Sequence, residues 1–391
     1  MSKIKILKLV LISAIIGGLS GVIIGGFLIL LEKVIELNLK YDLLILLLPL
    51  SGVLMTFLYK KYGKNSKKGN NLIIENINGR NEKIHLVMAP LVFIGTILTH
   101  LFGGSVGREG TGVQIGGTIG NLFADIFKKY DLDRKILLIS GVSSGFSAVF
   151  GTPIAGSIFA VEVSTVGSLT YASMLPAITA AIVGDKVVRF LGVSHSHFQI
   201  PPIESFDFIN IEKVILLSIC FGIISKLFVY MTDFFKVIFN KYIKDDYIKI
   251  FIGGSIMVCI TFLLGNRLYN NLSLGLLMDS FEGNVPYFAF IIKLTLTTLC
   301  LSVGYQGGEV TPLFVIGATL SPIVGIPVAF SAALGLIGVF AGATNAPIAS
   351  FILYLELFGS NNMIFAIIVC IISVFISGRK GIYSSQVWLE Y

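Results

Sequence analysis

Charged residues are scarce in this chain: they make up 13% of its 391 residues, whereas 55% are hydrophobic. A soluble domain needs a polar surface, which so few charges cannot supply. Apolar runs close to the length of a membrane-spanning helix, about 20 residues, recur along the chain. Clear examples are 9–31, 43–59, 136–163, 214–231, 250–264 and 322–339. The composition therefore predicts an all-α polytopic membrane protein.

Metal-ligand spacings are also missing. The four cysteines lie inside apolar runs without a CxxC pattern; they are Cys220, Cys259, Cys300 and Cys370. Such cysteines are usually small buried hydrophobic side chains. We interpret the segment His195-Ser196-His197 as a solvated loop rather than a metal site. We therefore expect no metal and no cofactor.

The formal net charge of +7 is concentrated in short lysine-rich segments. One loop contains Lys60, Lys61, Lys64, Lys67 and Lys68, and Lys3, Lys5 and Lys8 precede the first apolar run. Lysine-rich loops next to membrane spans mark the cytoplasmic side, so both the N-terminus and this loop are predicted to be cytoplasmic. A nucleic-acid surface would need arginine interleaved with aromatic residues on a soluble face, which the sequence lacks.

Two glycine-rich segments interrupt the apolar runs, and each contains a glutamate. They read Val106-Gly107-Arg108-Glu109-Gly110-Thr111 and Gln306-Gly307-Gly308-Glu309-Val310-Thr311-Pro312. Non-helical backbone at membrane depth is tolerated only where it is buried or lines a cavity. A pair of such breaks in corresponding halves indicates a transporter's binding site. Because helix starts offer unpaired amides and a positive dipole end, we predict that broken helices meet at a central anion site.

A second pair of matching segments indicates an internal repeat. Residues 147–156 resemble residues 340–350, and each segment precedes an apolar helix with one acid, Glu162 or Glu356. We predict one transport domain over 1–391, built from inverted-topology halves at roughly 1–195 and 210–391, without a cytosolic regulatory domain. We expect Glu162 and Glu356 to pair with buried backbone donors, and a transport role is the alternative.

The glutamates of the two breaks have different expected roles. A carboxylate is itself an anion, so Glu109 can occupy the anion site and leave it once protonated. That behaviour would couple anion and proton movement; the alternative is an ordinary acid at a helix start. For Glu309, assistance to proton movement and capping of the amides of its own helix are both open.

These motifs together resemble the CLC family of anion channels and transporters. Gly107-Arg108-Glu109-Gly110 matches the gating motif of the family, and the segment 307–312 is similar to its second-half Gly-Gly-X-X-X-Pro motif. The segment 150–156 is similar to the start of a dimer-interface helix. The resemblance implies a CLC fold, a bacterial inner membrane and a homodimer with one anion pathway per subunit. It implies transport rather than catalysis, although a membrane enzyme or receptor that holds a phosphate is a rival class; the P-loop context is absent.

Several details are most similar to the fluoride-exporting branch of that family. Thr111 stands where most members have proline, and Val163 stands where chloride-handling members carry a proton-relay glutamate. Their Gly-Ser-Gly-Ile-Pro motif is replaced by Gly69-Asn70-Asn71-Leu72, in a register that the sequence leaves open. The resemblance implies a proton-coupled fluoride antiporter; the alternative is a CLC-type chloride channel or chloride/proton antiporter.

The resemblance also implies a set of site residues. Glu109 would gate and carry protons, Glu309 would assist coupling, and the anion path would include Gly107, Arg108, Gly110, Val310, Thr311, Asn70, Phe358 and Tyr383. Fluoride is small and strongly hydrated, so good donors must offset the loss of its water shell. Amide and hydroxyl groups of Asn70, Asn71 and Thr311 are such donors, and ring edges carry partial positive charge.

Overall fold

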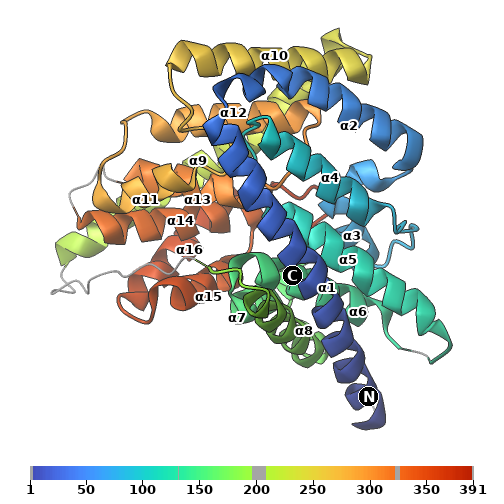
Figure 1. Ribbon diagram of the computed structural model, residues 1–391. Helices are drawn as coiled ribbons and strands as arrows, with labels where there is room; N and C mark the ends of the chain where they lie inside the picture. Colours follow the sequence, from blue (N-terminus) through green and yellow to red (C-terminus); the bar gives the residue numbers. More distant parts are fainter. Residues whose placement is uncertain (1–2, 131, 196–207, 322–325, 390–391) are drawn as a thin grey trace.

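The computed structural model describes residues 3–130, 132–195, 208–321 and 326–389, and this part of the chain is mainly helical (Figure 1). The first half contains α1 (Lys3–Lys40), η1 (Asp42–Leu47), α2 (Leu48–Tyr62), η2 (Ser66–Lys68), α3 (Asn70–Ile77), α4 (Met88–Leu101), α5 (Glu109–Ile126), η3 (Lys128–Tyr130), α6 (Arg134–Phe150), α7 (Pro153–Glu162) and α8 (Tyr171–Phe190). The second half contains α9 (Phe208–Tyr242), α10 (Asp246–Leu264), α11 (Leu274–Glu282), α12 (Ala289–Val303), α13 (Val310–Leu320), α14 (Val328–Thr344), α15 (Pro347–Phe358) and α16 (Met363–Ser377).

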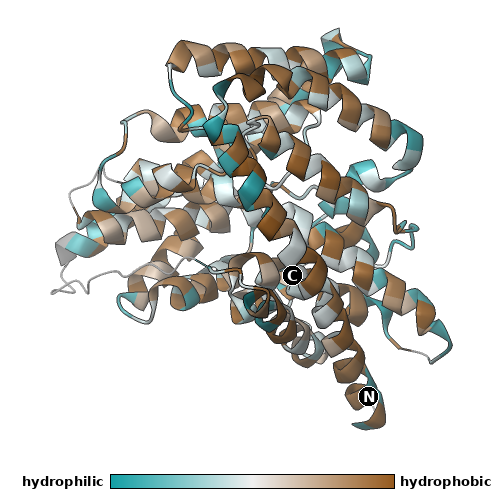
Figure 2. Ribbon diagram, viewed as in Figure 1, coloured by the Kyte–Doolittle hydropathy of each residue, from teal (hydrophilic) through white to brown (hydrophobic). Residues whose placement is uncertain are grey.

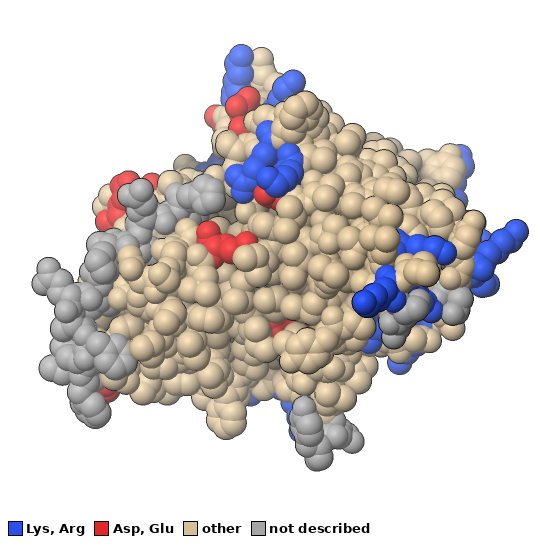
Figure 3. Space-filling view, turned by 90° about the horizontal axis from the view of Figure 1, so that it is seen from below, with Lys and Arg blue, Asp and Glu red and all other residues tan. Residues whose placement is uncertain are grey.

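Five helical segments in these described ranges are long and apolar enough to cross a membrane. They are α1, residues Asp42–Tyr62, α8, residues Asn210–Tyr242 of α9, and α10. Hydrophobic residues cover most of the helices, whereas hydrophilic residues gather in the loops (Figure 2). Figure 3 shows a broad face on which most residues are uncharged, with Lys and Arg mainly toward its margins and a few acidic residues within it. The predicted all-α polytopic membrane fold is therefore confirmed.

Three of the predicted apolar runs are not single α-helices. The run 136–163 breaks between α6 and α7, because Gly151 ends α6 in the left-handed region (φ +75) and Pro153 opens α7. The run 43–59 begins as the 3-10 helix η1 before α2 starts. The run 322–339 begins within residues 322–325, outside the described residues, and α14 begins only at Val328.

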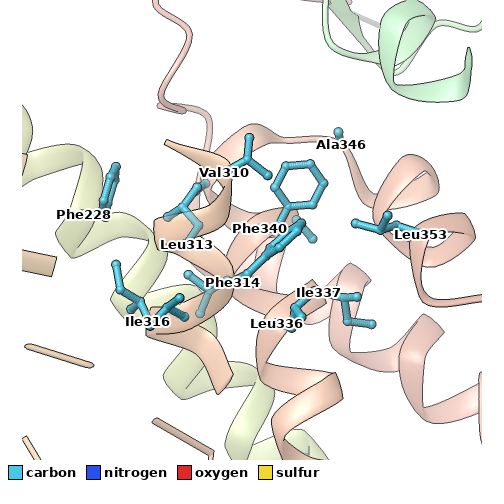
Figure 4. Close-up of a cluster of buried hydrophobic side chains, with 14 of the residues drawn as sticks. Phe228, Val310, Leu313, Phe314, Ile316, Leu336, Ile337, Phe340, Ala346 and Leu353 are labelled. Carbon is cyan, nitrogen blue, oxygen red and sulfur yellow. The ribbon is translucent and has the colours of Figure 1, made fainter. Parts of the chain in front are cut away.

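Close helix contacts at glycine recur in both halves. A Cβ on Gly116 of α5 would lie 2.0 Å from the carbonyl oxygen of Gly141 on α6, and a Cβ on Gly317 of α13 would lie 1.9 Å from that of Gly335 on α14. Any side chain would force these backbones apart. Small residues allow such approach between membrane helices, where packing rather than hydrophobicity drives association. Beside the second contact, Val310, Phe314 and other apolar side chains of α13 and α14 form a dense cluster (Figure 4).

Helices α7 and α15 bind each other's N-termini through their acids. The amides of Ile154 and Ala155, at the start of α7, donate to the Glu356 carboxylate at 2.9 and 2.7 Å. The amides of Ile348 and Ala349, at the start of α15, donate to Glu162 at 3.1 and 2.8 Å. The expectation that both acids pair with backbone donors is confirmed. Since each acid lies near the C-terminal end of its own helix, α7 and α15 are antiparallel, as inverted halves require.

A two-stranded parallel sheet, which the sequence did not predict, closes the chain. β1 (Thr165–Val166) follows α7 and pairs with β2 (Val387–Trp388). This pairing brings the segment after α16 into contact with the first half of the chain. This return places Tyr383 inside the protein, where 5% of it is exposed.

Candidate functional site

The two glycine-rich breaks hydrogen-bond to each other. The amide of Gly107 donates to the carbonyl of Gly308 at 2.5 Å, and the amide of Gly308 donates to the carbonyl of Gly107 at 2.7 Å. A Cβ on Gly308 would lie 2.6 Å from the amide nitrogen of Gly110, so only glycine fits there. Because α5 begins at Glu109 and α13 at Val310, the bridge brings two helix starts from opposite halves together.

Glu109 is fully buried at this junction, and its carboxylate binds the start of α13. Its Oε2 accepts from the amide of Thr311 at 3.1 Å and from the amide of Arg108 at 3.1 Å. Its Oε1 accepts from the hydroxyl of Thr311. The Arg108 guanidinium adds positive charge, with Nε 3.8 Å from Oε1. A carboxylate thus occupies donors from both breaks, in the place where an anion would bind.

Glu309 does not cap its own helix. It lies at the N-cap position of α13, but within the described ranges its side chain makes no capping hydrogen bond, and its Oε2 is buried without a partner. Glu109 from the other half takes the Thr311 donors instead. No capping hydrogen bond therefore supports the first interpretation of Glu309, and its assistance to proton movement stays a prediction. Val310 is 1% exposed, and its side chain packs in the apolar cluster (Figure 4). The side chain therefore offers no donor to an anion, and the backbone amide is the polar donor of this residue.

Asn70, at the start of α3, lies beside the first break. Its Nδ2 is 3.1 Å from the position of a Cβ on Gly110, and its Oδ1 is buried without a hydrogen-bond partner. Asn71 points elsewhere, because its Oδ1 accepts from the amide of Ser385 at 3.1 Å. The geometry thus places Asn70, and not Asn71, at the junction.

A cavity of about 1220 Å³ reaches this junction. Asn70, Glu309, Tyr383 and Gln114 of α5 line it. Gln114 is 5% exposed, and its Oε1 has no partner among the described residues. The sequence reasoning missed Gln114, although a polar side chain between the glycines of a buried membrane helix was a usable signal. The cavity therefore offers amide, hydroxyl and carboxyl groups next to the two helix starts.

Cations outnumber acids along the cavity wall. Among the described residues its lining includes Lys60, Lys64, Lys67, Lys68, Lys236, Lys249, Arg379 and Lys380, but besides Glu309 only Glu75, Asp233 and Asp246. Asp246 lies 2.8 Å from Lys67 and 2.8 Å from Lys249, and Asp233 lies 2.6 Å from Lys380. These pairs leave an excess of positive charge, which attracts anions.

Two other positions singled out in the sequence lie away from the contacts described so far. Phe358 is not among the residues that line the cavity; its ring packs 5.9 Å from Phe281 and 5.3 Å from Tyr354, centroid to centroid. Its place in the anion path therefore stays a prediction. His195 is not solvated: its side chain is 2% exposed and lies near Asp185, with Nε2 3.9 Å from Oδ1. Ser196 and His197 lie outside the described residues.

Comparison with known proteins identifies relatives over most of the chain. A family model described as voltage gated chloride channel matches residues 51–378. The chain is 35% identical to a protein named chloride/fluoride channel protein from Pseudomonas syringae pv. tomato, over 97% of this chain and 86% of that one. It is 26% identical to an H(+)/Cl(-) exchange transporter ClcA from Yersinia pestis, over 80% of this chain and 71% of that one.

Solved structures share the same architecture. A crystal structure of a CLC-type fluoride/proton antiporter superposes with a TM-score of 0.96 at 34% identity, with 100% of both chains covered. A slow cyanobacterial Cl-/H+ antiporter superposes with a TM-score of 0.83 at 19% identity, with 96% of both chains covered, and this second likeness concerns the fold alone.

Proposed function

We propose that this chain, which belongs to the voltage gated chloride channel (CLC) family, is a proton-coupled antiporter that exports fluoride from the cell. One observation carries the proposal: the Glu109 carboxylate binds the Thr311 amide and hydroxyl at the start of α13, where the two halves meet. An anion that can bind there competes directly with a side chain that can take up a proton. The similarity to a CLC-type fluoride/proton antiporter supports the same function.

The exchange follows from this competition. When Glu109 is protonated it loses its charge, and with it the main attraction to the amides of Thr311 and Arg108. Those donors then become available to fluoride, which approaches through the cavity past Asn70 and Tyr383. When Glu109 then loses its proton, the charged carboxylate returns to these donors and displaces the anion. Glu309 lies at the end of the same cavity with one oxygen unpartnered, which suits the assisting role in proton movement.

The assignment of fluoride as the substrate depends on the hydrogen-bond donors at the junction of the two breaks. The Thr311 hydroxyl and the Asn70 amide add to the helix-start amides, and they offset the high cost of dehydrating a small anion. The main rival is a CLC-type chloride channel or chloride/proton antiporter, since a protein named as an H(+)/Cl(-) exchanger is 26% identical to this chain. Halide efflux from proteoliposomes, recorded together with internal pH, separates the two. Fluoride efflux with opposite proton movement and little chloride efflux is expected, and equal fluoride and chloride efflux would refute the fluoride assignment.

The proposal includes the cellular setting. The protein would lie in the inner membrane as one transport domain over 1–391, divided into halves at roughly 1–195 and 210–391. The N-terminus and the lysine-rich loop from Lys60 to Lys68 would face the cytoplasm. That loop contributes to the cationic wall of the cavity, so the cavity would be the cytoplasmic entrance for fluoride.

We also propose a homodimer with one anion pathway in each subunit. Of the helices predicted to form the contact, α7 exposes Ile154 and α15 exposes Ile348. The neighbouring α16 exposes Ile371 and Phe375, so we add it to the predicted interface. Cross-linking in lipid should give dimers, and a dimer with one inactivated subunit should retain transport through the other. Loss of all transport in such a mixed dimer would exclude separate pathways.

A further inference from the structure

Lys293 is a fully buried cation in α12 that the exchange described above does not use. Its Nζ donates to the carbonyls of Tyr269 and Asn271 at 3.1 and 2.8 Å, and to the hydroxyl of Ser273 at 2.9 Å. A charged side chain at membrane depth is costly and normally marks a functional region. Here all three acceptors belong to one short loop between α10 and α11, so the lysine fixes the shape of that loop.

The same loop binds the segment that precedes Glu109. The side-chain amide of Asn270 donates to the carbonyl of Gly103 at 2.7 Å, and the backbone amide of Asn271 donates to the carbonyl of Gly104 at 3.0 Å. Both donors come from the second half of the chain, and both acceptors lie just ahead of the first glycine-rich break. The loop thus links the buried lysine to the segment that leads into Glu109.

One turn further along α12, Thr297 contacts the same segment directly. Its hydroxyl lies 3.1 Å from the hydroxyl of Ser105, and both side chains are 0% exposed. Residues four apart lie on one face of a helix, so Lys293 and Thr297 act from the same side of α12. Together they secure residues 103–105, through the loop and by direct contact.

We propose that Lys293 and Thr297 form a brace that positions Glu109. The two residues do not touch the anion; they hold the backbone from which Glu109 swings away from Thr311 and to which it returns. Functional groups must be held to within about 0.5 Å of their working geometry by the residues behind them. With a loosened brace, Glu109 reoccupies its donors incompletely, and fluoride passes without proton exchange. This inference rests on the proposed antiport function.

Two adjacent threonines of α12 provide a matched test. Thr298 is also 0% exposed, but among the described residues its hydroxyl bonds only to its own helix, at the carbonyls of Leu294 (2.8 Å) and Thr295 (3.1 Å). Thr297→Val and Thr298→Val therefore make the same chemical change at the same burial, and only the first breaks a link to the gate. The measured quantity is the number of protons exchanged per fluoride, obtained from the reversal potential in proteoliposomes under opposed fluoride and pH gradients.

The coupling ratio distinguishes positioning from mere support of folding, because it does not depend on how much protein is active. We expect uncoupled fluoride leak to rise about 2- to 10-fold in Thr297→Val, the equivalent of one lost hydrogen bond, and further in Lys293→Met. Thr298→Val should keep the wild-type ratio. A wild-type coupling ratio in Thr297→Val, or an equal shift of the ratio in both threonine variants, would refute the proposed brace. If Lys293→Met does not fold, Thr297→Val is sufficient for the test. A wild-type protein that exchanges no protons would instead refute the antiport function, and the brace with it.

Discussion

Replacing Thr311 with valine tests whether the hydroxyl that holds the Glu109 carboxylate also holds fluoride. The change keeps the branched shape and the backbone amide and removes one hydroxyl donor. A hydrogen bond to a charged group contributes about 1.5–3 kcal/mol, so fluoride should bind about 10- to 150-fold more weakly. Binding of the competing carboxylate weakens as well, which masks part of the effect in the wild-type background. The comparison is therefore made between Glu109→Gln and the double variant Glu109→Gln/Thr311→Val, where no carboxylate competes.

Isothermal titration of the purified variants with fluoride at constant ionic strength measures the loss directly. Thr319→Val is the matched control, because Thr319 lies on the same helix, is 3% exposed, and bonds to the carbonyl of its own-helix residue Val315 at 2.7 Å. In liposomes, Thr311→Val should also reduce the preference for fluoride over chloride. If the double variant binds fluoride as tightly as Glu109→Gln alone, Thr311 does not ligate the anion and the donor argument for fluoride selectivity is refuted.

Three further predictions concern the gate, the inter-repeat caps and the entrance. Glu109→Gln should abolish uphill fluoride movement driven by a proton gradient, since an amide neither titrates nor competes as an anion; wild-type coupling in this variant would assign proton transfer to another residue. Glu162→Gln and Glu356→Gln should each lower the free energy of unfolding by about 1–3 kcal/mol, because two backbone donors lose their charged acceptor. Halide selectivity should stay unchanged. Thermal denaturation measures the first effect, and halide efflux assays measure the second. Neutralising Lys64 and Lys236 on the cavity wall should slow fluoride entry at low ionic strength and matter little at about 1 M salt, where the screening length falls to about 3 Å; equal slowing at every salt concentration would contradict an electrostatic role.

The sequence was sufficient to predict the broken helices because clustered glycines are unfavourable inside a helix and therefore favour non-helical backbone within an apolar run. Gly107 and Gly308, which bridge the two halves, both lie within the predicted breaks. The prediction that Glu109 can occupy an anion site is consistent with its contact with the Thr311 amide. Motif spacing also predicted that Glu162 and Glu356 bind backbone donors. It gave no indication that each acid caps the helix of the opposite half, since spacing along the chain contains no information on which ends meet in space.

The remaining features of the site depend on contacts between distant parts of the chain. Glu309 was weighed as a cap because it sits at a helix start, but Glu109 approaches the Thr311 amide from the other half and takes that role. Phe358 was assigned by family pattern, and its ring contacts Phe281 of α11 and Tyr354 of α15; its place in the anion path stays a prediction. The sequence did not predict a role for Lys293, because its acceptors are two carbonyls and a hydroxyl of a loop distant along the chain, and no local pattern marks them.

The contact between Glu109 and Thr311 has a consequence for the way the protein is made. The two residues are 202 positions apart, and at about 5–20 residues per second a ribosome needs about 10–40 s to add that length of chain. Throughout that interval the newly inserted first half has an acid and open glycine amides with no partner at membrane depth. These groups must meanwhile stay close to water or within the insertion machinery. The contact between Glu109 and Thr311 thus forms late in biosynthesis. It can form only after the second half has entered the membrane in the opposite orientation.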